Sequence, residues 1–150
     1  ELFFAVFEWF IEQGAATVKV DIAVLGRTVS ERLVALSESV ISQWVHLKGE
    51  FVLVMEFWAA SASSQSRDRF REAFSNLYGH YRKIIVDLLQ EGIARGEFRS
   101  DLATDSIAAA VVGAWDAMFL QAWFDDNFDL HQVSEDYIQV LIRGFLEKPE

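Results

Sequence analysis

The chain of 150 residues contains no cysteine and a single proline, Pro149. Without cysteine there is no disulfide framework, no thiolate nucleophile and no zinc site built on sulfur. Because proline breaks helices and marks loops, its absence from the first 148 residues favours helices joined by short connections. Strand-like alternation bounded by turn dipeptides is also missing. These absences predict an all-α fold.

Basic residues are few, since 13 Lys and Arg stand against 23 Asp and Glu, and the formal net charge is −10. An acidic surface repels phosphate, so we expect this chain alone not to bind nucleic acid. The longest apolar run, Ile107 to Trp115, ends at Asp116 and is shorter than the roughly 18 residues of a membrane span. Glu1 and Glu8 interrupt the apolar start, which argues against a signal peptide. We therefore expect a soluble, cytoplasmic protein.

Hydrophobic residues are abundant at 52%, and they include 13 Phe, 5 Trp and 3 Tyr. That content can build a sizeable core, and no linker is long enough to divide the chain. We therefore expect residues 1–150 to form a single domain.

Helical spacing of the apolar residues predicts six helices. Their approximate bounds are Leu2–Val24, Thr28–Leu47, Phe51–Ala60, Ser66–Arg95, Thr104–Phe124 and Ser134–Phe145. Thr28 and Glu31 have the spacing of a capping box at the start of the second helix. Gly96 is placed to end the long fourth helix in a left-handed conformation. Thr104 is the expected cap of the fifth helix, and Ser61–Ser66 is the expected loop before the fourth.

The helix around Trp115 has apolar or small residues on nearly every side, interrupted by Asp116. A helix of this kind is buried on all sides, either inside a monomer or against a second subunit. The last helix is also broadly apolar, so we expect two copies to form a four-helix dimer interface. The predicted interface residues are Ala109, Ala110, Gly113, Ala114, Val140, Leu141, Gly144 and Phe145.

Two segments resemble a known family. Residues 1–6, Glu-Leu-Phe-Phe-Ala-Val, are similar to the start of the fourth helix of TetR-type transcriptional regulators, which follows their helix-turn-helix head. Residues 88–99, Leu-Leu-Gln-Glu-Gly-Ile-Ala-Arg-Gly-Glu-Phe-Arg, resemble the end of that family's seventh helix. The helices at Ile107–Phe124 and Tyr137–Leu146 look like its eighth and ninth. The resemblance implies an effector-binding domain that dimerises through those last two helices.

The family's DNA-binding head would precede Glu1 and is not in this sequence. The resemblance therefore implies DNA binding for a parent protein rather than for this chain. It further implies a bacterial, homodimeric regulator, usually a repressor, that responds to a small hydrophobic or amphipathic effector.

Effectors of such domains lie among the inward faces of several helices. Aromatic side chains suit a flat apolar or cationic ligand, although any one of them is more often plain core than pocket wall. The predicted pocket residues are Trp44, Trp58, Tyr78, Tyr81, Trp115, Phe119 and Trp123. Glu56 and Asp116 lie in apolar surroundings, where a partly buried carboxylate attracts a cation or accepts hydrogen bonds from the backbone or an arginine.

Catalytic and metal-binding patterns are not evident. His46, His80 and His131 are far apart and supply no metal site. No nucleophile elbow or acid–base pair stands out, so neither enzymatic activity nor a cofactor is expected. The alternative to a ligand-sensing domain is a helical dimerisation module without a functional pocket. Tight packing around Trp115 and Tyr81, with no cavity above about 300 Å³, would favour that alternative.

Overall fold

The computed structural model describes residues 4–9, 28–46, 49, 51–63 and 67–146, and every structural statement below concerns these residues. Residues 4–9 are helical. The helices that follow are α2 (Val29–His46), α3 (Phe51–Ser63), α4 (Arg67–Ala94), α5 (Thr104–Phe124) and α6 (Leu130–Phe145). The predicted all-α fold is confirmed. The rest of the first predicted helix, with Gly14, lies outside the described residues.

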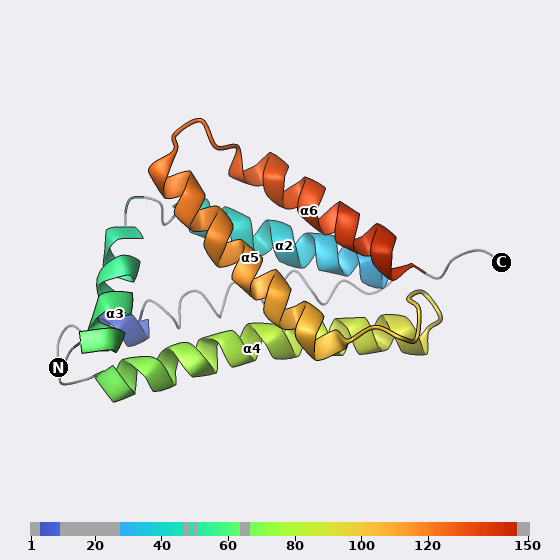
Figure 1. The fold of residues 1–150 in the computed structure, drawn as a ribbon, viewed down its shortest axis with the longest axis horizontal. Coiled ribbons are helices and arrows are strands. Elements are labelled where there is room, and N and C mark those ends of the chain that lie inside the picture. The colour runs from blue at the N-terminus through green and yellow to red at the C-terminus, as the bar shows by residue number, and fades with distance from the viewer. Residues whose placement is uncertain (1–3, 10–27, 47–48, 50, 64–66, 147–150) are drawn as a thin grey trace.

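Helix α5 runs diagonally between α6 and α4 (Figure 1). Helices α2 and α6 run side by side, while α5 crosses α2 and packs against both α4 and α6. Helix α3 lies across one end and packs on α4. The other helices therefore cover one side of α5. The middle of α5, around Trp115, lies at the centre of the domain.

A buried polar contact joins three of these helices. The Trp115 indole Nε1 donates to Ser37 Oγ at 3.2 Å, and Ser37 Oγ lies 3.0 Å from Ser134 Oγ. All three side chains are buried. Because a buried polar atom without a partner is costly, this chain of hydrogen bonds fixes the register of α2, α5 and α6.

Helix α4 ends at a glycine in the left-handed conformation. Gly96 has a φ of 70°, as predicted, and its N–H donates to Ile93 O. The next amide, that of Glu97, donates to Gly92 O at 2.9 Å. These two hydrogen bonds form a Schellman motif, which needs a residue without Cβ strain at the left-handed position.

The turn after α4 also caps the start of α2. The Glu97 carboxylate accepts hydrogen bonds from Val29 N at 2.9 Å and from Ser30 N at 2.8 Å. These amides belong to the first turn of α2, where no intrahelical partner exists and negative charge is favourable. Burial acts to raise the pKa of Glu97, but the hydrogen bonds from Ser30 and Val29 prevail and lower it. Glu97 therefore stabilises the fold above its ordinary pKa, and that contribution is lost as the pH falls through the lowered value.

Three predicted helix starts or ends can be compared directly with the structure. The capping box is confirmed, since Glu31 N donates to Thr28 Oγ1 and Thr28 N donates to Glu31 Oε2. The predicted loop at Ser61–Ser66 is wrong at its start, because α3 continues to Ser63. Thr104 is the first residue of α5 rather than its cap, and the cap residue Ala103 makes no side-chain hydrogen bond.

The predicted start of the last helix at Ser134 is wrong. Helix α6 begins one turn earlier, at Leu130, and its cap is Asp129, whose Oδ1 accepts a hydrogen bond from Gln132 N at 3.0 Å. Ser134 is buried and bonded to Ser37, so its hydroxyl serves packing between helices rather than capping.

Helix α5 is buried on one side only. Its buried residues are Ala108, Val111, Val112, Trp115, Met118 and Phe119. The opposite side carries small exposed residues: Ala109, Ala110, Gly113 and Ala117. Its length and hydropathy alone would allow it to cross a membrane, a feature that counting uninterrupted apolar residues had missed, but the core helix of a soluble protein has the same properties.

Candidate functional site

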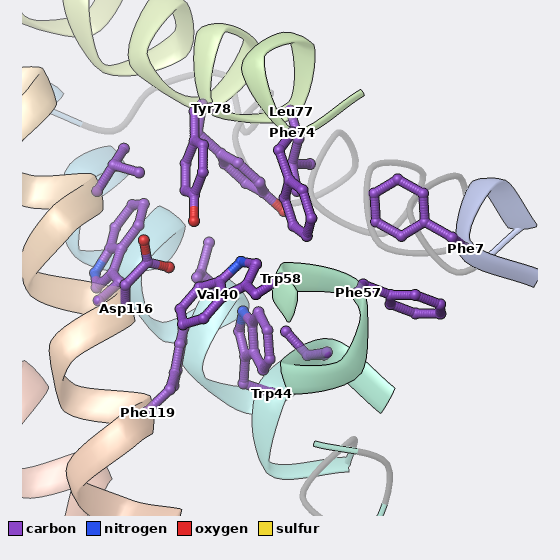
Figure 2. A pocket seen from close by; sticks show the side chains of 14 residues that line it. Phe7, Val40, Trp44, Phe57, Trp58, Phe74, Leu77, Tyr78, Asp116 and Phe119 are labelled. Carbon is purple, nitrogen blue, oxygen red and sulfur yellow. The ribbon is translucent and has the colours of Figure 1, made fainter. Parts of the chain in front are cut away.

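A cavity of about 60 Å³ lies between α2, α3, α4 and α5. Its wall is almost entirely aromatic or aliphatic, and side chains from all four helices converge on it (Figure 2). Phe7, from the helical segment at residues 4–9, also lines it. We call this space the inner cavity.

Seven of the nine residues predicted at a pocket line the inner cavity. They are Trp44, Trp58, Tyr78, Tyr81, Trp115, Asp116 and Phe119. Trp123 is not among them and instead lines a separate cavity at the far end of α5. The prediction of a partly buried carboxylate is correct for Asp116 and wrong for Glu56, whose side chain is exposed on the outer face of α3.

Sequence reasoning missed several apolar residues of the wall. These are Phe7, Val40, Val54, Phe57, Phe74, Leu77 and Val112. Helical spacing offered a signal for two of them, because Phe74 and Leu77 each lie four residues before a predicted tyrosine, Tyr78 and Tyr81. Phe7 could not be placed in this way, since only the packing of the chain brings it to the cavity.

Three polar side chains of the inner cavity form one connected group. The Trp58 indole N–H donates to the Tyr78 hydroxyl, which in turn donates to the Asp116 carboxylate. Figure 2 shows the Tyr78 hydroxyl directed from α4 towards Asp116 on α5, with Trp58 beside it. A carboxylate with one hydroxyl donor, surrounded by aromatic rings, retains the capacity to bind a further donor or a cation.

The cavity shifts the acidity of both groups. Burial raises the pKa of Asp116 to about 6, while the hydrogen bond from Tyr78 acts in the opposite direction. Burial, and then the neighbouring Asp116 carboxylate, raise the pKa of Tyr78 above its ordinary value. At neutral pH the site therefore holds a protonated tyrosine beside a carboxylate that is mostly ionised but poorly solvated.

The Asp116→Asn variant should be more stable than the wild type at about pH 7.5, by about 3 kcal/mol. The folded chain binds the Asp116 proton more tightly than the unfolded chain does. The cost of the buried charge is therefore absent below the ordinary pKa of 3.8, grows as the pH rises to about 6, and is constant above that. Urea unfolding of both proteins at about pH 4 and pH 7.5 measures this difference.

Glu56→Gln is the matched control, because Glu56 is an acid on α3 whose side chain is exposed. We expect that substitution to change stability little at either pH. An Asp116→Asn variant that is no more stable than the wild type at pH 7.5 would show that the carboxylate carries no such cost.

Aromatic contacts stiffen the wall of the inner cavity. Trp44 and Phe119 are stacked with their ring centroids 4.4 Å apart and an interplanar angle of 25°. Tyr81 contacts Trp115 edge to face at 6.3 Å. Ring pairs of these geometries add stability beyond the area they bury, so they stabilise the closed form of the wall.

Phe7 connects the inner cavity to a second aromatic cluster. This cluster comprises Phe4, Phe7, Phe57 and Phe70. The Phe7 ring lies 4.8 Å from that of Phe57, 5.1 Å from that of Phe70 and 4.9 Å from that of Phe74. The guanidinium of Arg69 lies 3.9 Å from the centroid of the Phe4 ring. The segment at residues 4–9 is therefore held against α3 and α4 by rings that also border the cavity.

The residues predicted at a dimer interface divide into two groups. Ala109, Ala110 and Gly113 on α5 are exposed, as are Val140 and Gly144 on α6, and Val140 is 65% exposed. The others face inward to different degrees: Ala114 and Leu141 are half-buried, and Phe145 is buried against Phe98 at 5.8 Å. Phe145 is thus a core residue, because α6 turns that side towards the end of α4.

Clusters of three or more His, Asp or Glu side chains that could hold a metal ion do not occur in the described part of the chain. His46 and His131 are exposed, at the end of α2 and the start of α6. The ionisable group that distinguishes the inner cavity is Asp116.

Residues 39–134 match the family described as "Tetracyclin repressor-like, C-terminal domain". The match covers more than half of the chain and includes α3, α4 and α5 and every lining residue of the inner cavity except Phe7. Comparison with curated proteins and with solved structures finds no match. The chain belongs to the family of TetR-like C-terminal domains, which are ligand-binding and dimerisation domains of transcriptional regulators.

Proposed function

We propose that this domain senses a small amphipathic cation in the inner cavity and transmits its binding through residues 4–9. The observation that carries the proposal is Asp116, a carboxylate inside an aromatic wall, whose pKa burial raises to about 6. A cationic ligand would neutralise that charge and stack on the surrounding rings. A fatty-acyl anion would bring a second negative charge to the same place.

The size of the inner cavity supports a conformational response. Its volume of about 60 Å³ is below the roughly 150 Å³ that accommodates a benzene ring. A ligand with one ring must therefore move wall residues, and it binds the expanded cavity better than the closed one. Such differential affinity is what shifts an equilibrium between two states. Because Phe7 belongs to the wall, expansion would displace the segment that resembles the connection to a DNA-binding head.

The proposed cation is tested with benzyltrimethylammonium, which has one ring and a permanent charge, and with decanoate as the anionic alternative. Thermal shift and quenching of tryptophan fluorescence should report binding of the cation. Asp116→Asn should weaken that binding about ten-fold, because it removes the charge and keeps the shape. Glu56→Gln serves as the control. If the wild type bound decanoate more tightly than the cation, or if the wild type and Asp116→Asn bound the cation equally, a cationic ligand at Asp116 would be contradicted.

The second candidate is a dimerisation module whose cavity binds nothing. The small volume of the inner cavity favours it, since ligand pockets usually enclose about 300–1,000 Å³. The absence of any thermal shift or quenching across cations and fatty-acyl compounds would decide for this alternative. In both cases we expect a cytoplasmic bacterial homodimer whose parent protein, most simply a repressor, binds DNA through a separate head.

The proposed dimer interface is the exposed face of α5 and α6. Small residues on α5 would allow close approach of a second copy, and Val140 supplies exposed apolar area on α6. We expect the chain to sediment as a dimer at micromolar concentration. Gly113→Arg should raise the dissociation constant roughly a hundred-fold, because the side chain would project into the partner. Beyond its chain neighbours and the surrounding helix backbone, no described atom lies within 4 Å of a Cβ there.

Ser75→Arg introduces the same side chain at an exposed position of α4 and should leave the dimer intact. Sedimentation velocity on the three proteins measures the difference. A wild-type monomer, or a Gly113→Arg variant that is as dimeric as Ser75→Arg, would show that this face is not the interface.

A further inference from the structure

A second cavity, of about 250 Å³, lies where the end of α5 and the start of α6 meet the end of α2 and the start of α3. We call it the outer cavity. It is larger than the roughly 150 Å³ that holds benzene, whereas the inner cavity is smaller. In this conformation, the outer cavity is therefore the one of the two that can accept a ring without rearrangement.

The outer cavity is lined by aromatic faces. The Trp123 and Phe51 rings lie 5.2 Å apart with an interplanar angle of 36°, and Phe51 meets Trp44 edge to face at 6.0 Å. Trp123 is half-buried, which leaves part of its indole available to a ligand. Phe128 contributes a further ring from the connection between α5 and α6. A wall of this kind favours a flat ligand that stacks on it.

The ionisable side chains among its described lining residues are Asp129 and His131, and no lysine or arginine is among them. Asp129 Oδ1 accepts the capping hydrogen bond from Gln132 N, which fixes the carboxylate at the edge of the cavity. A fixed carboxylate beside aromatic faces favours a cation over an anion.

We propose that the outer cavity is a second ligand site, which binds a bicyclic aromatic ring bearing a positive charge. Ligand binding there does not require that the inner cavity bind anything. The two cavities also have a physical connection, because the stacked pair Trp44 and Phe119 lines both cavities and forms the partition between them. A ligand that displaces either ring would change the volume on the other side.

The test uses three probes with the same ring: tryptamine, which is cationic, indole, which is neutral, and indole-3-acetate, which is anionic. Isothermal titration calorimetry on the whole chain should rank their affinities in that order. Trp123→Leu should weaken tryptamine binding at least ten-fold, because it removes one of the two indole faces of the site. Phe124→Leu is the matched control, since Phe124 is the next residue on α5, is 76% exposed and does not line the cavity.

Asp129→Asn tests the charge without removing the helix cap, because an asparagine side chain also accepts the hydrogen bond from Gln132 N. It should reduce the affinity for tryptamine to that for indole and leave indole unchanged. Circular dichroism verifies that each variant retains its helices. If Trp123→Leu does not fold, the result with Asp129→Asn decides the outcome. Failure of tryptamine to bind at millimolar concentration, or equal affinities for all three probes, would overturn the proposal. Loss of tryptamine binding in Asp116→Asn but in neither Trp123→Leu nor Asp129→Asn would also overturn it, because the ligand would then occupy the inner cavity.

Discussion

Replacing Gly92 with alanine should lower the free energy of unfolding by about 3 kcal/mol. A Cβ at this position would lie 2.1 Å from Cδ2 and 2.4 Å from Cε2 of the Phe98 ring, far inside van der Waals contact. Phe98 has little freedom to yield, because its ring is buried against Phe145 and its backbone is bridged to Leu146. The turn that caps α2 through Glu97 would be displaced together with the ring.

Gly79→Ala is the same substitution in the same helix. Beyond its chain neighbours and the surrounding helix backbone, no described atom lies within 4 Å of a Cβ at Gly79, so alanine there should stabilise α4 by about 0.5–1 kcal/mol. Urea unfolding monitored by circular dichroism compares the two variants with the wild type. Similar stabilities for Gly92→Ala and Gly79→Ala would show that the close packing of Phe98 on α4 is not a determinant of the fold.

Truncation of Trp115 to alanine should cost about 3–5 kcal/mol. The side chain is 3% exposed, lies in the middle of α5 and contacts Tyr81 from α4. Its removal leaves a large cavity in the core and also breaks the hydrogen bond to Ser37. This single side chain therefore both buries apolar area and fixes the register of the helices through its hydrogen bond.

Trp115→Phe separates the two contributions. It keeps a ring in the core and removes the indole N–H, so we expect a cost of about 1–2 kcal/mol for the lost hydrogen bond and the reduced volume. Equilibrium unfolding in urea measures both variants. If the free energy of unfolding of Trp115→Ala were within about 1 kcal/mol of that of the wild type, the loss would be too small for a core truncation. The centre of the domain would then not be packed around this residue.

Local signals in the sequence were sufficient for most helix boundaries. Thr28 and Glu31 satisfy each other within one turn, and Gly96 supplies the left-handed residue that ends α4, so both features can be recognised from a few neighbouring letters. Ser134 shows the limit of this reasoning. Its type suits a cap, but its hydroxyl is bonded to Ser37, almost a hundred residues earlier in the chain. Tertiary packing decides that role, and no local pattern contains it.

The aromatic character of the inner cavity was predictable from the sequence, but its lining residues were predictable only in part. Tyrosine and tryptophan combine a large ring with one polar atom, which is why Tyr78 and Trp58 could be singled out from composition. The correctly predicted pocket residues differ from the wrongly predicted ones in the direction that each side chain faces relative to the neighbouring helices. Trp123 lies two turns after Asp116 and reaches a different cavity, and Glu56 faces away from the neighbouring Trp58. Those directions depend on how α3 and α5 are rotated against α4, which follows from the packing of the whole domain.

The central claim is that the Asp116 carboxylate in the inner cavity recognises a cation. The most direct measurement is the affinity for benzyltrimethylammonium by isothermal titration calorimetry at about pH 5 and about pH 7.5. Because the charge of this probe does not change with pH, any change in affinity arises from the protein. With the pKa of Asp116 at about 6, the wild type should bind roughly ten-fold more weakly at the lower pH, and Asp116→Asn should bind equally weakly at both. An affinity for the wild type that is the same at both pH values would contradict the account.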